Sequence, residues 1–169
     1  GGKFSEKTYQ NVSGQNGIGG KGVALSAKWF MAQSYRQEGI ATLIVEKGVK
    51  KSFKIEENKS SQTGTVVSFI PDEEVYNLEP INIDYEEVRL MCKNWSFLSK
   101  NLKFILVNHI TGQKDLFLSK NGLLDLLKDN VKNPIHSTPI YYELKSGNME
   151  AEIAAQWTKD KEVVYTFTN

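Results

Sequence analysis

The run Ser13-Gly14-Gln15-Asn16-Gly17-Ile18-Gly19-Gly20-Lys21-Gly22 joins a polar segment at residues 1–12 to a run of helix-forming residues. We expect that helix over 23–31, where apolar side chains recur with helical spacing. Glycines allow backbone amides to approach a polyphosphate closely, and the start of a helix adds unpaired N–H groups and the positive end of its dipole. A glycine-rich loop that leads into a helix therefore predicts phosphate binding.

The loop fails one familiar nucleotide-binding motif and matches another. The P-loop requires a glycine where Gln15 stands and a serine or threonine where Gly22 stands. The dinucleotide motif G-x-G-x-x-G is matched by Gly17, Gly19 and Gly22, and Glu46 ends a strand where a ribose-binding acid is expected. That motif also needs a buried strand before the loop and a βαβ unit after it, and the sequence indicates neither. Dinucleotide binding is therefore kept only as an alternative.

Alternating apolar residues beyond the expected helix predict an antiparallel sheet. The segments Ile40–Glu46 and Lys51–Glu56 form a hairpin around Gly48. A third strand covers Thr65–Ile70 and ends at Pro71.

The second half of the chain predicts two helices and five more strands. An amphipathic helix is expected over 86–100, with Asp84 as its N-cap. The further elements are strands Leu102–Val107 and Asp115–Leu118, a helix Lys120–Lys128 capped by Ser119, and strands Ile140–Leu144, Met149–Gln156 and Val163–Thr168. Together they indicate an α+β fold, with a mostly antiparallel sheet and helices on one face. The expected domains are 1–130 and 140–169, joined by a linker at 131–139.

Composition narrows the classes of function. The 169 residues include 21 basic and 20 acidic side chains, so the chain has no basic footprint for nucleic acid. Its one cysteine, Cys92, excludes an internal disulfide and predicts a reducing, cytoplasmic setting. No apolar run approaches ~18 residues, so no membrane span is expected. The sequence starts with Gly1 instead of Met and has no signal-peptide pattern, so we expect the natural protein to begin earlier.

Six segments occur in the order that is found in one protein family. They are Gly1-Gly2-Lys3-Phe4 with Tyr9 and Val12-Ser13-Gly14; Ala24-Leu25-Ser26; Ser34-Tyr35-Arg36 with Gly39; Thr63-Gly64-Thr65-Val66-Val67-Ser68-Phe69-Ile70-Pro71-Asp72; Phe97-Leu98 with Asn101-Leu102; and Glu152-Ile153-Ala154-Ala155-Gln156-Trp157 with Val164-Tyr165-Thr166-Phe167-Thr168-Asn169. These segments resemble the ATPase subunits of DNA gyrase and topoisomerase IV over essentially the whole chain. The loop also resembles the G-x-x-G-x-G box that gyrase shares with heat-shock chaperones, histidine kinases and MutL.

The resemblance implies a partial Bergerat-type ATPase sandwich, followed by the first strands of a ribosomal protein S5-like transducer domain. The implied ATP-binding residues are Lys3, Tyr9, Gly14, Gln15, Asn16, Gly17, Ile18, Gly19, Gly20 and Thr65. Amides of the box would wrap the triphosphate, Lys3 would lie near the phosphates, and Tyr9 and Thr65 would lie near the nucleoside. Each of these three side chains also has an ordinary alternative: a solvated lysine, a packing aromatic and a strand threonine.

The chain departs from the family pattern in two places. One extra residue lies between Tyr9 and Val12, and the asparagine that usually precedes Ala24-Leu25-Ser26 is missing. These departures leave the register of the phosphate contacts open.

The family's catalytic residues fall outside this sequence. Its catalytic glutamate, Mg²⁺-binding asparagine and adenine-binding aspartate precede the lid, and its γ-phosphate lysine follows in the next domain. The resemblance thus implies ATP and Mg²⁺ as cofactors, with the Mg²⁺ ligand upstream of Gly1. It implies no catalytic residue and no metal ligand within the chain, so we expect this chain alone not to hydrolyse ATP.

For the parent protein, the resemblance implies a type II DNA topoisomerase near the bacterial nucleoid. Its partners would be ATP, DNA, the DNA-cleaving subunit and a second copy that joins when ATP binds. A different class stays open: a truncated, non-catalytic homologue that serves as a protein-interaction module.

Overall fold

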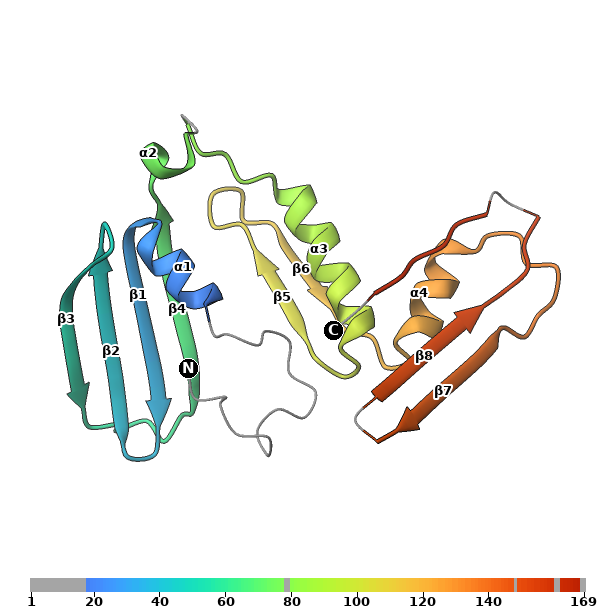
Figure 1. Cartoon of the computed structure of the whole chain (residues 1–169), viewed down its shortest axis with the longest axis horizontal. Helices are drawn as coiled ribbons and strands as arrows, with labels where there is room; N and C mark the ends of the chain where they lie inside the picture. Colours follow the sequence, from blue (N-terminus) through green and yellow to red (C-terminus); the bar gives the residue numbers. More distant parts are fainter. Residues whose placement is uncertain (1–17, 78–79, 148, 160–161, 168–169) are drawn as a thin grey trace. The chain divides into compact units, whose positions relative to one another are not determined.

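The computed structural model describes residues 18–77, 80–147, 149–159 and 162–167. The described chain divides into two compact units, one up to Asn82 and the other from Ile83 onward. Each unit is described by itself (Figure 1).

The first unit is a four-stranded antiparallel sheet with two short helices. Its elements are α1 (Gly19–Leu25), β1 (Ala27–Arg36), β2 (Gly39–Glu46), β3 (Val49–Glu56), β4 (Gly64–Pro71) and α2 (Glu73–Tyr76). The strand order is β3-β2-β1-β4, so β1 pairs on both sides (Figure 1). The strands expected at Ile40–Glu46, Lys51–Glu56 and Thr65–Ile70 are confirmed, each extended by one or two residues.

The core of this unit lies where α1 covers one end of the sheet. Phe30 of β1 pairs with Val45 of β2 on one side and with Phe69 of β4 on the other. Phe30 and Val45 are buried, and Val23 and Ala24 of α1 pack against them. Because directly paired residues point to the same side of a sheet, this register defines one surface that we call the α1 face.

The helix expected over 23–31 is wrong in its second half. The observed helix α1 starts earlier, at Gly19, and ends at Leu25, while Ala27–Arg36 form the inner strand β1. The composition of the segment favours a helix locally, but ladder hydrogen bonds to two neighbouring strands outweigh that weak preference. Ser26 marks the change, since its N–H and its hydroxyl both donate to the carbonyl oxygen of Gly22.

The second unit combines two helices with two separate hairpins. Its elements are α3 (Tyr85–Leu98), β5 (Phe104–Val107), β6 (Lys114–Phe117), α4 (Leu123–Asn130), β7 (Ile140–Ser146) and β8 (Met149–Ala155). Asp84 is confirmed as the N-cap of α3, because its Oδ1 accepts hydrogen bonds from the amides of Glu86 and Glu87 at 2.7 and 3.2 Å. The helix α4 begins three residues later than expected, after Gly122 with a φ of +60°.

The strand expected at Val163–Thr168 is not formed over its described part. Residues 163–167 form no strand, and they line a hollow together with residues of α4 instead of extending a sheet. The hydroxyl of Tyr165 donates to Oδ1 of Asn130 at the end of that helix. This segment therefore lines a hollow with a helix, although the alternation of its apolar side chains is typical of a strand.

Candidate functional site

Four of the ten residues predicted to bind ATP lie in the described part of the chain. These are Ile18, Gly19, Gly20 and Thr65. The other six, Lys3, Tyr9, Gly14, Gln15, Asn16 and Gly17, lie outside the described residues.

The end of the glycine box forms the start of α1. Ile18 is the N-cap residue and makes no side-chain cap, while its carbonyl accepts the amide of Gly22 at 2.7 Å. The amides of Gly19 and Gly20 precede that first helical hydrogen bond, so α1 itself has no acceptor for them. A Cβ atom built at Gly19 or Gly20 would meet no described atom within 4 Å. Packing of the described chain therefore does not explain why these two positions are glycine.

Thr65 lies on the α1 face of the sheet. It pairs with Ser34, which lies four residues along β1 from the core residue Phe30. Side chains alternate along a strand, so Phe30, Ser34 and Thr65 all point to the side that α1 covers. Four residues of strand correspond to about 13 Å. An extended nucleoside triphosphate can span such a distance, so α1 and Thr65 could contact opposite ends of one ligand.

A hollow of about 480 Å³ adjoins Thr65 at the end of the sheet. Its lining residues are Ser34, Tyr35, Arg36, Gln37, Glu38, Thr63, Gly64 and Thr65. The pairing of Tyr35 with Gly64 brings the two segments together, and Asn58 holds the rim by donating to the carbonyls of Arg36 and Gln62, both at 2.8 Å. Arg36 is not among the predicted site residues, and the pairing of β1 with β4 brings it to the same hollow as Thr65.

The described residues offer no metal centre and no membrane-spanning helix. Within residues 18–77, 80–147, 149–159 and 162–167, no group of three or more histidine, cysteine or acidic side chains could hold a metal ion. None of the described helices is long and apolar enough to cross a membrane. The α1 face offers a ligand the free amides at the start of α1 and, about four strand residues away, the hydroxyl of Thr65 and the guanidinium of Arg36, which suits an anion attached to a polar ring.

No family model matches the chain, but curated proteins and solved structures do. The solved structures show the class of fold. The 43K ATPase domain of Thermus thermophilus gyrase B, in complex with an aminocoumarin, matches 82% of this chain and 38% of its own with a TM-score of 0.73 at 21% identity. The topoisomerase IV ATP-binding domain of Francisella tularensis matches 82% of this chain and 38% of its own with a TM-score of 0.66 at 20% identity. The chain thus has the α+β fold of the gyrase B ATPase domain.

The curated relatives show the family. The DNA gyrase B protein of Archaeoglobus fulgidus is 30% identical over all of this chain, and the topoisomerase 4 B protein of Mycoplasma capricolum is 28% identical, also over all of it. The chain belongs to the family of gyrase and topoisomerase IV B proteins, the ATPase subunits of these enzymes. It spans only 27% and 26% of these two relatives, so it corresponds to part of such a subunit.

Proposed function

We propose that the chain forms part of the ATP site of a type II DNA topoisomerase, in which ATP binding and hydrolysis drive the passage of one DNA duplex through another. The observation that carries this proposal is the register of β4 on β1, which puts Thr65 on the sheet face that α1 covers. The last residues of the glycine box and the predicted adenine-pocket threonine therefore belong to one surface.

Within this site, we assign the triphosphate to the amides of the glycine box, Gly14 to Gly20, and the adenine to the neighbourhood of Thr65 and Tyr9. Lys3 is assigned to the phosphates, and Arg36 adds a positive charge beside Thr65. Residues 1–130 would be the ATPase part, 131–139 a linker, and 140–169 the start of the transducer domain. For the whole protein, we propose Mg²⁺ as a further cofactor and a location near the nucleoid. Its proposed partners are DNA, the DNA-cleaving subunit and a second copy of the ATPase subunit.

We also propose that the 169-residue chain binds ATP without hydrolysing it. A general base must lie within hydrogen-bond reach of the attacking water. In the family that the chain resembles, this base is a glutamate on a helix before the lid, and no residue here matches its motif.

Calorimetric titration of the chain with a non-hydrolysable ATP analogue and Mg²⁺ tests the proposed site. Thr65→Val keeps the shape of the side chain but removes its hydroxyl, so affinity should fall by about three- to tenfold, as expected for one hydrogen bond. Thr42→Val is the matched control, because Thr42 pairs with Gln33 on the opposite face of the sheet and accepts a hydrogen bond from it. Equal affinities of the two variants, or heat released with NAD and not with the ATP analogue, would contradict the proposal.

A further inference from the structure

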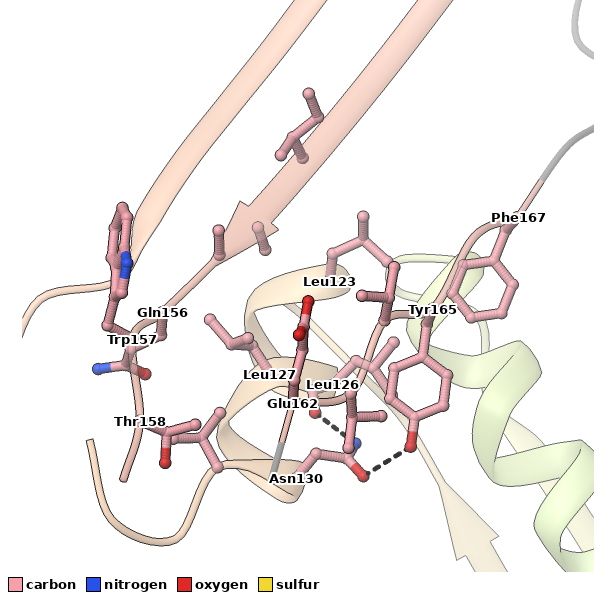
Figure 2. Close-up of a pocket in the computed structure, with 16 residues that line it drawn as sticks. Leu123, Leu126, Leu127, Asn130, Gln156, Trp157, Thr158, Glu162, Tyr165 and Phe167 are labelled. Atoms are coloured by element: carbon pink, nitrogen blue, oxygen red, sulfur yellow. Dashed lines mark hydrogen bonds between the residues drawn. The ribbon is translucent and has the colours of Figure 1, made fainter. Parts of the chain in front are cut away.

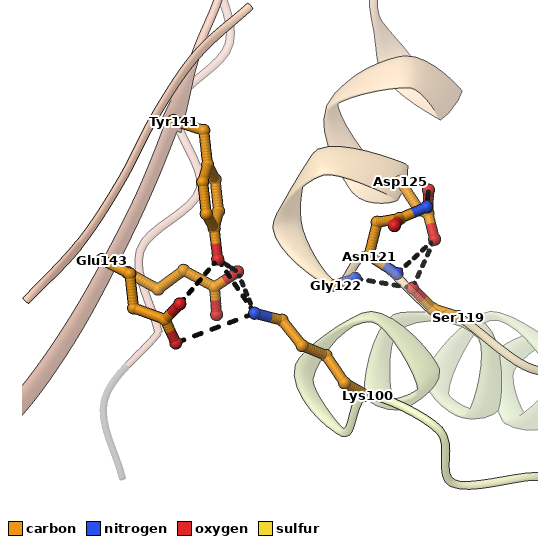
Figure 3. A network of polar contacts seen from close by, with 8 residues as sticks. Lys100, Ser119, Asn121, Gly122, Asp125, Tyr141 and Glu143 are labelled. Atoms are coloured by element: carbon orange, nitrogen blue, oxygen red, sulfur yellow. Dashed lines mark hydrogen bonds and ion pairs between the residues drawn. The ribbon is translucent and has the colours of Figure 1, made fainter.

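One lysine ties the end of α3 to the β7–β8 hairpin. Lys100 lies two residues beyond the last residue of α3, and its Nζ donates to the hydroxyl of Tyr141 at 2.9 Å. The same Nζ lies 3.0 Å from Oε1 of Glu152 and 3.9 Å from Oε1 of Glu143. The Tyr141 hydroxyl in turn donates to Glu152 at 2.9 Å, so one cation joins a phenol and two carboxylates that all belong to the hairpin (Figure 3).

The Lys100–Glu152 pair is better shielded from solvent than the other described ion pairs, whereas Glu143 is 64% exposed. The side chains of Lys100 and Glu152 are 33% and 26% exposed, whereas those of Lys145 and Glu150 on the same hairpin are 70% and 45% exposed. Partly buried pairs are screened less by water and salt than exposed ones. Hydrogen bonds to Tyr141 and Glu152 raise the pKa of Lys100, so the cluster favours the charged form of the lysine.

The stem of Lys100 reaches the hairpin by crossing Gly122, whose φ of +60° and ψ of −122° favour glycine. A Cβ atom at Gly122 would lie 2.5 Å from Cε of Lys100 and 3.2 Å from the carbonyl oxygen of Phe97. Gly122 also starts α4, and its amide donates to Oγ of Ser119 at 2.9 Å (Figure 3). The lysine therefore passes over the start of α4 on its way from α3 to β7, and it touches three elements.

The hairpin needs such a tie, because two strands alone are marginally stable in water. Elsewhere β8 packs on α4, and just beyond β8 the amide of Ile135 donates to the carbonyl oxygen of Trp157 at 2.9 Å, so the hairpin is also joined to residues 133–136. A groove of about 670 Å³ lies among Leu126 and Leu127 of α4, Ile153 and Ala155 of β8, and the segment around Tyr165 (Figure 2). Apolar packing therefore fixes the hairpin only partly.

We propose that Lys100 is a positioning residue, a latch that holds the β7–β8 hairpin on the α3–α4 pair. In the proposed domain division, the hairpin is the first element of the transducer domain, and α3 and α4 are the last helices of the ATPase part. Lys100 would then be the point at which movement of these helices is passed to the transducer. The latch itself requires no nucleotide, so its test is independent of the test of ATP binding.

Hydrogen exchange of the 169-residue chain tests the latch. Lys100→Met keeps the stem and removes the charge. Amides of β7 and β8 should then exchange about tenfold faster or more, as expected for lost hydrogen bonds to a charged group, while α3 and β1–β4 keep their protection. The matched control is Lys145→Met, which removes the exposed Lys145–Glu150 pair of the same hairpin and should change exchange by less than about fivefold.

A second pair of variants separates the charge from the bulk of the side chain. Lys100→Glu alone should release the hairpin, and Lys100→Glu combined with Glu152→Lys should restore most of its protection, because the ion pair is re-formed with reversed polarity. The latch is refuted if Lys100→Met behaves like Lys145→Met, if the double variant is not rescued, or if α3 and β5–β6 lose protection together with the hairpin.

Discussion

Phe30 is the largest buried side chain in the core of the first unit. It is 5% exposed, it pairs with strands on both sides, and α1 packs against its cluster. Removing a buried phenylalanine costs its transfer free energy and leaves a cavity. We therefore expect Phe30→Ala to lower the free energy of unfolding of this unit by about 3–5 kcal/mol.

The measurement is urea unfolding in a background that carries Trp95→Phe and Trp157→Phe, followed through the fluorescence of Trp29, the neighbouring residue on β1. Phe53→Ala is the matched control, since Phe53 lies on β3 with 56% of its surface exposed, and about 1 kcal/mol or less is expected there. Similar midpoints for the two variants would show that the core does not centre on Phe30.

At the scale of elements, Tyr85 joins the first turn of α3 to β6. Its hydroxyl donates to Oδ2 of Asp115 at 2.7 Å. Three causes together raise the pKa of Tyr85 to about 12. Partial burial is the largest, and the hydrogen bond to Asp115 and the negative charge of Asp115 add to it. The unfolded chain loses this proton near pH 10, whereas the folded chain keeps it. The stabilisation is therefore complete below pH 10 and is lost as the pH rises from about 10 to 12.

Phenolate absorbance and the free energy of unfolding across this pH range check the prediction. Wild type should lose stability more steeply above pH 10 than Tyr85→Phe, and Asp115→Asn should move the pKa of Tyr85 back toward its usual value. A tyrosine that titrates near pH 10 in both wild type and Asp115→Asn would contradict the assigned cause.

Elements that depend on neighbours in sequence could be predicted, and those that depend on distant partners could not. The hairpin around Gly48 and the start of α3 at Asp84 follow from local turn and capping chemistry. Ala27–Met31 have a helix-forming composition, and only strands β2 and β4 make them a strand. Conversely, Val163–Phe167 alternate like a strand but lie along α4. Sequence periodicity does not say which partner a segment will meet.

At the scale of the whole molecule, the candidate nucleotide site also combines features set by neighbours in sequence with features set by distant partners. The place of Thr65 on β4 could be predicted from its motif, because the Gly-Thr pair and the strand that follows are contiguous, while its role in binding ATP stays a prediction. Arg36 could not be, since it reaches the Thr65 hollow only through the register of β1 on β4. That register also sets the face to which each side chain points, and a shift by one residue would turn Thr65 away from α1.

If the two ends of the α1 face bind one nucleotide, the ligand should stabilise the folded chain. A ligand at ~100 times its dissociation constant adds about 2.7 kcal/mol, which corresponds to roughly 5–10 °C in Tm for a chain of this size. We predict this shift with Mg²⁺ and an ATP analogue for a variant carrying Trp95→Phe and Trp157→Phe, in which fluorescence reports on Trp29 of the first unit alone.

NAD serves as the control ligand, and it should leave Tm unchanged. A shift with NAD alone would favour the dinucleotide alternative. Unchanged Tm with the ATP analogue would mean that the residues of this chain do not form a usable site by themselves, because a ligand that binds only the folded state must raise Tm.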